Sequence, residues 1–299
     1  MQRDQQCIIF GASSQPGSWL VPSLIEKGWT VHLISRGVKP QIAYGPNAIW
    51  HNLDLKNRNT QFPAIEARVV IDTLGIASEW IDRLQNVGAE RVITFSSTSV
   101  FTKINSTDPV DVQSVHAGLQ RERAFAETCA RTRIDWTILR PTLIYGGKFG
   151  DRTVRDIAGV IRRFGFFPVF GDATGLRQPV HADDLARACL QICYNRETYN
   201  RSYNVGGGEI LPYHEMVARI FAAMGRRPRM LRIPLPAFEL AAKLARLHPS
   251  YRHIRSSMAE RMGKDMTFSN AEAISDFGYA PRPFKVASQD VLVLGIQDT

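Results

Sequence analysis

Two ionisable residue types are missing from the middle of this 299-residue chain. No tyrosine occurs between Tyr44 and Tyr145, and no lysine occurs between Lys103 and Lys148. The stretch that both gaps share therefore contains neither a phenol nor an ammonium group that could exchange a proton with a bound molecule. Acid–base chemistry in this stretch would need another kind of side chain.

Long apolar runs and cysteines are also scarce. No run approaches the roughly 20 apolar residues that a membrane-spanning helix needs, and the first residues lead directly into an apolar strand without a signal peptide. Four cysteines are too few for a disulfide scaffold of this length. Cys189 and Cys193 are four apart in a helical pattern, which fits either a metal pair or two buried apolar residues. We expect a cytoplasmic protein that does not span a membrane.

The charge is unbalanced, with 37 basic and 28 acidic residues and a formal net charge of +9. Basic surfaces attract polyanions, but the arginines are scattered and no stacking platform of aromatic and basic residues is present. A phosphate-bearing substrate or a negatively charged protein partner explains the charge equally well. The basic segment from Gly225 to Pro234 fits a surface for an acidic partner or lipid headgroups, or the solvated side of a helical lobe. We expect no nucleic-acid partner.

The first 35 residues follow the order strand, glycine turn, helix, strand. An apolar run at 7–10 ends at Gly11, apolar residues follow at helical spacing over 19–25, and a second apolar run occupies 31–34. This order is typical of a βαβ unit, which produces a parallel sheet. Strand patterns at 69–71, 91–95 and 136–139 alternate with helical patterns at 79–87 and 121–130. The chain is therefore predicted to be an α/β protein with a Rossmann-type, doubly wound parallel sheet.

The alternation changes after Gly147, where helices, prolines and arginines become more frequent. We predict a dinucleotide-binding domain over residues 1–147, to which residues from about 176 to 205 return. Residues 148–175 and 206–299 are predicted to form a smaller, mostly helical lobe for a substrate or a partner.

The turn after the first strand has the composition of a nucleotide-binding loop. Gly11 and Gly17 stand at its ends, Ser13 lies within it, and Ser14 occupies the place of the middle glycine in the usual Gly-x-x-Gly-x-x-Gly pattern. Glycines allow a tight turn there, and the N–H groups of the following helix can bind a pyrophosphate. Serine is small and can itself donate a hydrogen bond to phosphate, so we predict dinucleotide binding at this loop.

The end of the second strand indicates which dinucleotide is bound. NAD sites generally have an acidic residue there, whereas this chain has Arg36. An arginine can pair with the 2′-phosphate of NADP, although Arg36 can also be a solvated residue beside Gly37. The sequence favours NADP(H), with NAD(H) as the other option. Asp54 is predicted to lie beside the adenine, and Leu74 along the cofactor.

Several ordered motifs resemble one family. The chain is similar to the extended and atypical short-chain dehydrogenase/reductases, in particular the NAD-dependent epimerase/dehydratase family, over nearly its whole length. The matching segments are 95–101 (FSSTSVF), 136–146 (WTILRPTLIYG), 178–186 (QPVHADDLA), 204–207 (NVGG) and 278–283 (GYAPRP). The resemblance implies a catalytic role for Ser97 and a place beside the nicotinamide for Pro141.

The same resemblance implies a Tyr-x-x-x-Lys pair, which this chain lacks. Counting back from Arg140 through Glu127 puts Leu119 and Arg123 at the two positions. Leucine cannot exchange a proton, whereas Arg123 can still hold the nicotinamide ribose electrostatically. Sliding the register places His116 at the tyrosine position, which restores no Tyr/Lys pair either.

Three other residues are candidates for the site. His116 can act as a general base near neutral pH, or be a loop residue before a helix. Tyr145 can approach the nicotinamide side of the cleft. Arg177 lies four residues before His181, at the spacing of the arginine that binds the substrate diphosphate in nucleotide-sugar epimerases; it can also be a surface arginine.

Two functions follow from these patterns. The first is a non-catalytic cofactor-binding, redox-sensing or accessory protein, comparable to the nucleotide-binding accessory subunit of respiratory complex I. The alternative is an NAD(P)-dependent oxidoreductase or epimerase of a nucleotide-linked or other small substrate with a non-standard acid and base. The family resemblance also implies a homodimer formed through two helices, one of which follows Ser97.

Overall fold

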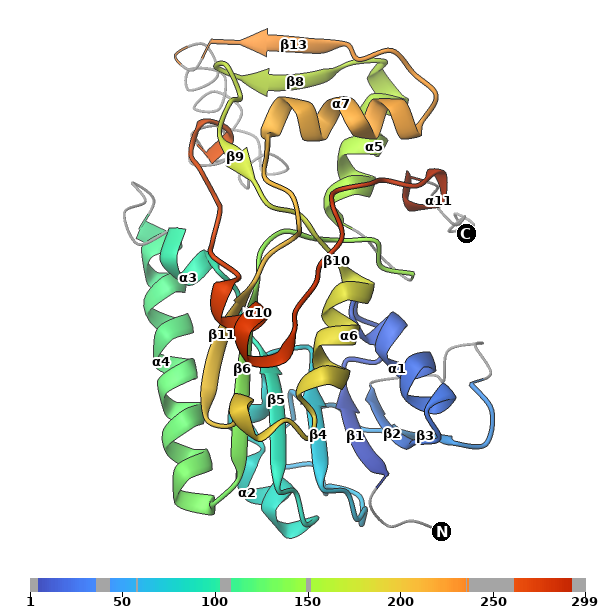
Figure 1. The fold of residues 1–299 in the computed structure, drawn as a ribbon, viewed down its shortest axis with the longest axis vertical. Helices are drawn as coiled ribbons and strands as arrows, with labels where there is room; N and C mark the ends of the chain where they lie inside the picture. Colours follow the sequence, from blue (N-terminus) through green and yellow to red (C-terminus); the bar gives the residue numbers. More distant parts are fainter. Residues whose placement is uncertain are drawn as a thin grey trace.

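The computed structural model describes residues 5–35, 44–57, 59–102, 109–148, 152–234, 236 and 261–291. Its centre is a seven-stranded sheet in which all neighbouring strands are parallel, in the order β11-β6-β5-β4-β1-β2-β3 (Figure 1). The strands are β1 (Gln6–Phe10), β2 (Thr30–Ser35), β3 (Ala48–Asn52), β4 (Val69–Asp72), β5 (Arg91–Phe95), β6 (Asp135–Pro141) and β11 (Arg201–Val205). The prediction of a doubly wound, Rossmann-type sheet is confirmed.

Helices cover both faces of this sheet. On one face, α1 (Gly17–Glu26) and α6 (Ala182–Ile192) share a buried apolar cluster with strand residues such as Ile9. On the other, α2 (Ile81–Asn86) and α4 (Pro109–Thr132) pack in a cluster that includes Ile8. Since successive strand residues point to opposite faces, a central strand covered on both sides must be apolar throughout. This explains the continuous apolar runs in β1 and β4.

A second hydrophobic core lies beyond the carboxyl ends of the sheet strands, in the upper part of Figure 1. It is built from α5 (Arg152–Phe164), β8 (Phe167–Phe170), α7 (Tyr213–Ala223), β13 (Met230–Ile233) and α11 (Ser288–Val291), with β13 parallel to β8. This core explains the change of pattern after Gly147. The predicted domain boundaries themselves stay a prediction.

Short elements connect the two cores. The strands β7 (Ile144–Tyr145) and β10 (Val180–His181) pair in parallel, and β9 (Leu176–Arg177) pairs antiparallel with β12 (Leu211–Pro212). The remaining short elements are η1 (Ala77–Glu79), α3 (Ser99–Thr102), η2 (Arg196–Thr198), η4 (Arg261–Gly263) and α10 (Ala271–Phe277). The chain therefore returns to the sheet through β11 after contributing strands to the connection.

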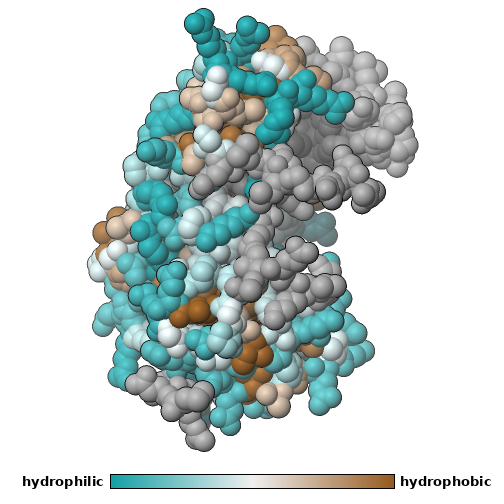
Figure 2. Space-filling view, turned by 90° about the vertical axis from the view of Figure 1, so that its right-hand side faces the viewer, coloured by the Kyte–Doolittle hydropathy of each residue, from teal (hydrophilic) through white to brown (hydrophobic). Residues whose placement is uncertain are grey.

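The surface and the cysteines have ordinary features. Figure 2 shows a mostly hydrophilic face on which hydrophobic residues form small separate groups. None of the helices in the described ranges has the length and apolar character that a membrane crossing requires. Cys189 and Cys193 are buried in the cluster between α6 and the sheet, and burial raises the pKa of both thiols. Their surroundings fit the interpretation as buried apolar residues.

Candidate functional site

The candidate site lies at the carboxyl edge of the sheet, where the strand order reverses. Chain connections from β1 and β4, which are neighbours, leave in opposite directions at this point, and ligands of open α/β sheets bind in the resulting crevice. Gly11 follows β1, Leu74 follows β4, Ser97 follows β5, and Pro141 ends β6. Because the strands are parallel, the fold brings these four predicted residues to one edge.

The turn between β1 and α1 has the backbone that its glycines predict. Gly11 has φ +87°, a left-handed conformation that glycine adopts without strain. At Gly17 a Cβ atom would overlap the carbonyl oxygen of Gly11, so the helix approaches the turn as closely as glycine permits. The N–H of Ser14 donates to the carbonyl of Gly11 at 2.9 Å and closes the turn.

Ser14 changes what this turn offers to a ligand. Its hydroxyl accepts a hydrogen bond from the N–H of Gly17 at 3.0 Å and lies 2.7 Å from the hydroxyl of Thr73. Pro16, at the N-cap of α1, has no N–H to donate. The start of α1 therefore offers fewer free N–H donors to a ligand than it would with a glycine in place of Ser14.

A dinucleotide pyrophosphate still fits the shape of this turn. Gly17 lies so close to Gly11 that a side chain would not fit between them. A pyrophosphate site requires a turn with this close backbone packing. Ser13 is exposed beside it. When bound, the cofactor would supply a nicotinamide ring for hydride transfer, and Ser13, Ser14 and the backbone of the turn are the groups placed to hold its phosphates.

Asp72 holds the next loop in place, a role that sequence reasoning missed. Its side chain is fully buried and accepts hydrogen bonds from the backbone N–H groups of Leu74, Gly75, Ile76 and Ala77 at 2.6–3.1 Å. A Thr94 hydroxyl donates a fifth bond at 2.8 Å. Burial raises the pKa of Asp72, and these donors oppose the rise. An acidic residue ending an apolar strand was the available signal.

A cavity of about 210 Å³ opens beside Ser97, between β5 and α4. The Ser97 hydroxyl itself accepts the N–H of Ser99 at 3.1 Å. Serines are the commonest residues of the cavity wall. The wall consists of Leu74, Gly75, Ser78, Thr94, Phe95, Ser96, Ser97, Ser99, Val100, Ser114, Gly118, Arg121, Glu122, Phe125 and Ile138.

An ion pair at this wall corrects the predicted register of α4. Arg140 donates to both oxygens of Glu122 at 2.6–3.1 Å, with the two side chains 18% and 11% exposed. Glu127, through which the register was counted, is exposed. Counting back four and eight residues from Glu122 gives Gly118 and Ser114, and both line the cavity together with Ser97. We therefore assign the positions of the missing lysine and tyrosine to Gly118 and Ser114.

The residues first assigned to these positions lie elsewhere on α4. His116 and Arg123 are exposed, Leu119 is half-buried, and none of the three lines the cavity. Helix geometry explains this. Leu119 and Arg123 each come one position after a cavity-lining residue, which is a rotation of about 100° around the helix axis, and His116 comes two positions after Ser114. The cofactor and acid–base roles predicted for Arg123 and His116 do not fit this placement. The absence of tyrosine and lysine is unaffected, since serine and glycine occupy the corrected positions.

Arg177 and Tyr145 are interior residues with backbone partners, and their roles as substrate ligands stay predictions. Arg177 is 4% exposed and donates to the backbone carbonyls of Leu176, Arg261 and Lys264 at 2.5–2.9 Å. The hydroxyl of Tyr145 accepts the N–H of Lys285, and burial raises the pKa of Tyr145 to about 12. Both side chains tie separate segments of the chain together.

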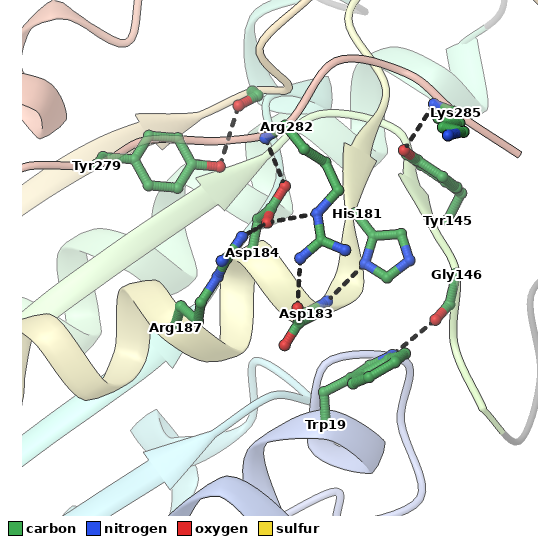
Figure 3. Close-up of polar contacts among 11 residues, drawn as sticks. Trp19, Tyr145, Gly146, His181, Asp183, Asp184, Arg187, Tyr279, Arg282 and Lys285 are labelled. Atoms are coloured by element: carbon green, nitrogen blue, oxygen red, sulfur yellow. Dashed lines mark hydrogen bonds and ion pairs between the residues drawn. The ribbon is translucent and has the colours of Figure 1, made fainter.

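A group of rings and backbone contacts fixes the loop after β7 against α1 (Figure 3). The Trp19 indole donates to the carbonyl of Gly146 at 2.7 Å. His181 lies edge-on to Trp19 and Tyr145, and its Nδ1 accepts the N–H of Asp183 at the start of α6. Burial lowers the pKa of His181, so the neutral form is favoured. His181 thus has a capping and packing role.

Asp184 is the centre of an ion-pair cluster next to these rings (Figure 3). Its side chain has no exposed surface and accepts the Nε–H and backbone N–H of Arg282, each at 2.9 Å, and an N–H of Arg187. Arg282 also pairs with Asp183. The cluster joins the start of α6 to the segment near residue 282.

The other predicted cofactor residues have simple surroundings. The Asp54 carboxylate is exposed and accepts the N–H of Lys56 at 3.0 Å. Pro141 is buried, and its carbonyl accepts the hydroxyl of Thr98 at 3.1 Å. Arg36 lies outside the described residues. The roles of Asp54, Pro141 and Arg36 toward a cofactor stay predictions.

Comparisons with known proteins agree with this architecture. Residues 70–206 match the model of the NAD dependent epimerase/dehydratase family. The uncharacterized protein y4nG of Sinorhizobium fredii is 26% identical over 263 residues, which are 84% of this chain and 63% of that protein. The mitochondrial NADH dehydrogenase (ubiquinone) 1 alpha subcomplex subunit 9 of Arabidopsis thaliana is 25% identical over 126 residues, which are 42% of this chain and 31% of that protein. The chain thus spans less than two thirds of either relative.

A solved structure of the same fold is the UDP-glucuronic acid 4-epimerase from Bacillus cereus in complex with NAD. It has a TM-score of 0.69 at 15% identity, with 95% of each chain covered. This similarity shows the fold. The resemblance predicted from the motifs is confirmed by the match of residues 70–206 to the NAD dependent epimerase/dehydratase family model.

Proposed function

We propose that the chain binds NADP(H) in the crevice between β1 and β4 and uses it as a structural or redox-reporting ligand, without the acid–base chemistry of a tyrosine–lysine pair. The single observation that carries this proposal is the composition of the cavity beside Ser97. At the two α4 positions where that pair would face the cavity, the chain has Ser114 and Gly118. A serine hydroxyl and a hydrogen atom cannot replace a phenol and an ammonium group at neutral pH.

The comparisons support the cofactor part of the proposal. The similar epimerase from Bacillus cereus was solved in complex with NAD, and the turn from Gly11 to Gly17 has the shape that a dinucleotide needs. The relative from Arabidopsis thaliana is a subunit of an NADH dehydrogenase, which fits an accessory role. The preference for NADP(H) rests on Arg36 in the sequence.

Cofactor binding is tested by the thermal stability of the purified protein with NADPH, NADP, NADH or NAD. A ligand at 100 times its Kd stabilises the folded state by about 2.7 kcal/mol, which for a chain of this size raises Tm by several degrees. We expect the largest rise with NADPH. Arg36→Asp should remove the advantage of NADPH over NADH, whereas Arg227→Asp, the same charge change on an exposed arginine between α7 and β13, should leave it intact. No rise with any of the four would contradict the proposal.

The non-catalytic part is tested by the NADPH absorbance of the wild-type protein during incubation with carbonyl compounds and nucleotide sugars. We expect the absorbance to stay constant with every substrate. Oxidation of NADPH that Ser97→Ala abolishes would instead establish the alternative function, an oxidoreductase or epimerase with a non-standard acid.

The corrected register gives a sharper version of this test. Ser114→Tyr and Gly118→Lys place a phenol and an ammonium group in the cavity, with Val100→Ala added because a Cβ at Gly118 would lie 2.9 Å from a Val100 methyl group. The matched control is Leu119→Tyr with Arg123→Lys on the other side of α4. NADPH oxidation by the first variant, and none by the control, is expected. Activity in the control alone would contradict the register.

A further inference from the structure

A second cavity lies at the opposite, amino edge of the sheet. Its volume is about 370 Å³, and it lies where β4, β5 and β6 begin, toward the lower end of the sheet in Figure 1. From Arg91 to Phe95, β5 advances about 13 Å, which separates it from the cavity beside Ser97. The wall consists of Arg68, Val69, Glu90, Arg91, Asp135, Tyr194, Arg196 and Tyr199.

Arg91 is the unusual residue of this wall. It is 3% exposed, and its Nη2 donates to the hydroxyls of Thr137 and Thr198 at 2.5 and 3.1 Å and to the Ile192 carbonyl at 3.3 Å. Its Nε and Nη1 are buried and have no hydrogen-bond partner among the described residues. Three N–H groups of a buried cation are therefore unsatisfied, which is costly in a protein interior.

Three other inward-facing arginines of the described residues have partners for their guanidinium groups, and Arg155 shares the feature only at its Nε. Arg140 is paired with Glu122, Arg282 with two aspartates, and Arg177 donates to three backbone carbonyls. Within the described part of the chain, Arg91 has no carboxylate as a hydrogen-bond partner, and the Tyr199 ring lies 4.3 Å from its guanidinium carbon. Burial lowers the pKa of Arg91 to about 10, the direction expected for a cation without a paired anion.

The charges around the cavity leave a positive balance. Three arginines face two carboxylates in the wall. Glu90 lies 3.5 Å from Arg68 across an exposed pair, and Asp135 accepts a hydrogen bond from the side chain of Asn200. Arg196 is exposed at the same wall. The site thus combines a buried guanidinium, exposed arginines and tyrosine rings in a space large enough for a small molecule.

We propose that this cavity binds a small oxyanion-bearing metabolite, a phosphate or a carboxylate, whose charge the Arg91 guanidinium and the exposed Arg68 and Arg196 neutralise. Guanidinium groups match both oxyanions through paired N–H donors. The ligand would occupy the amino edge while a dinucleotide occupies the carboxyl edge, so binding at one edge does not require the other to be empty.

Isothermal titration calorimetry of the full chain with inorganic phosphate, and separately with malonate, tests this site at constant ionic strength. We expect saturable binding of at least one of the two, and the stronger one identifies the source of the oxyanion. Arg196→Glu should weaken binding at least tenfold, and so should Arg91→Lys, which keeps the charge but loses the paired donors. Arg227→Glu makes the same charge change on an exposed arginine between α7 and β13. It should change the affinity less than twofold.

The proposal fails if neither oxyanion binds saturably. It also fails if Arg227→Glu weakens binding as much as Arg196→Glu, because the binding would then follow net charge alone. Phosphate binding that Arg196→Glu leaves unchanged would place the anion at another site, such as the turn after β1, and would overturn the proposal as well. If Arg91→Lys does not fold, Arg196→Glu with its control decides.

Discussion

The cavity beside Ser97 and the ion-pair cluster around Asp184 use polar side chains in opposite ways. In the cluster, Asp184 is fully buried and every contact pairs an acid with a base or a backbone N–H. In the cavity, hydroxyl groups predominate, and Glu122 is already paired with Arg140. Charges therefore join segments in the cluster, whereas Ser114 and Gly118 give the α4 side of the cavity neutral groups.

The largest expected effect comes from breaking the cluster. Asp184→Ala leaves the Arg282 guanidinium without its buried partner, which should lower the free energy of unfolding by about 3–5 kcal/mol. Urea unfolding measures this loss. Glu90→Ala removes an acid from the exposed pair with Arg68 and should cost less than about 1 kcal/mol. Equal decreases in the free energy of unfolding in both variants would show that the buried cluster around Asp184 stabilises the fold no more than the exposed pair of Glu90 and Arg68.

A smaller effect is expected at the border of the cavity. Glu122→Gln leaves Arg140 with a neutral partner, and a loss of about 2 kcal/mol in the free energy of unfolding should follow because the pair is mostly buried. Glu127→Gln, on the exposed side of α4, should change it by less than about 0.5 kcal/mol. A larger loss in Glu127→Gln than in Glu122→Gln would favour the register counted through Glu127. The tyrosine and lysine positions would then not be Ser114 and Gly118.

A pH-dependent effect is expected in a third region, on β2 and β3. His32 Nδ1 lies 3.0 Å from His51 Nε2, and its other nitrogen lies 3.3 Å from Oε1 of the Gln6 side chain. Burial, with a smaller contribution from His51, lowers the pKa of His32 from 6.5 to about 4. The unfolded state then binds more protons between these values, so stability should fall as the pH decreases from about 6.5 to 4.

His32→Gln tests this dependence, because an amide can keep a hydrogen bond to His51 without titrating. The fall in the urea midpoint between pH 7 and pH 5 should be smaller in this variant than in the wild type. His116→Gln, which changes an exposed histidine, serves as the control and should leave the fall unchanged. An identical pH profile in all three proteins would show that other groups cause the dependence.

The smallest effect should come from the hydroxyl groups of the cavity. Ser114→Ala removes a hydroxyl whose position faces the cavity, and the free energy of unfolding should change by less than about 0.5 kcal/mol. NADPH binding, measured by the rise in Tm, should also stay the same. A large decrease in the free energy of unfolding, or in the rise of Tm with NADPH, would show that the Ser114 hydroxyl contributes to stability or to cofactor binding.

Features that depend on local spacing were predictable. The parallel sheet and its crevice edge were predicted from the apolar runs, the glycine turn from Gly11 to Gly17 and the helix between the first two strands. This was possible because the periods of strands and helices appear in the spacing of neighbouring residues. The absence of tyrosine and lysine could also be read from the sequence, since a gap of 41 residues, from 104 to 144, does not depend on an alignment.

Features that depend on which residue faces which were not predictable. A 24-residue helix such as α4 allows several registers, and the contact between Arg140 and Glu122 selects one of them. Arg177 has the spacing of a ligand but is buried among backbone carbonyls. Arg91 looks ordinary in the sequence, because its hydrogen-bond partners come from the distant residues Thr137, Ile192 and Thr198.

The sequence by itself determined the fold class and the absence of tyrosine and lysine from residues 104–144, because these depend on composition and order along the chain. The tertiary structure alone decided that Ser114 and Gly118 line the cavity beside Ser97 and that Arg177 donates to three backbone carbonyls. It also decided that Arg91 is buried with no carboxylate as a hydrogen-bond partner among the described residues. The physical reason is that hydrogen bonds and burial belong to side chains brought together from separate strands and helices.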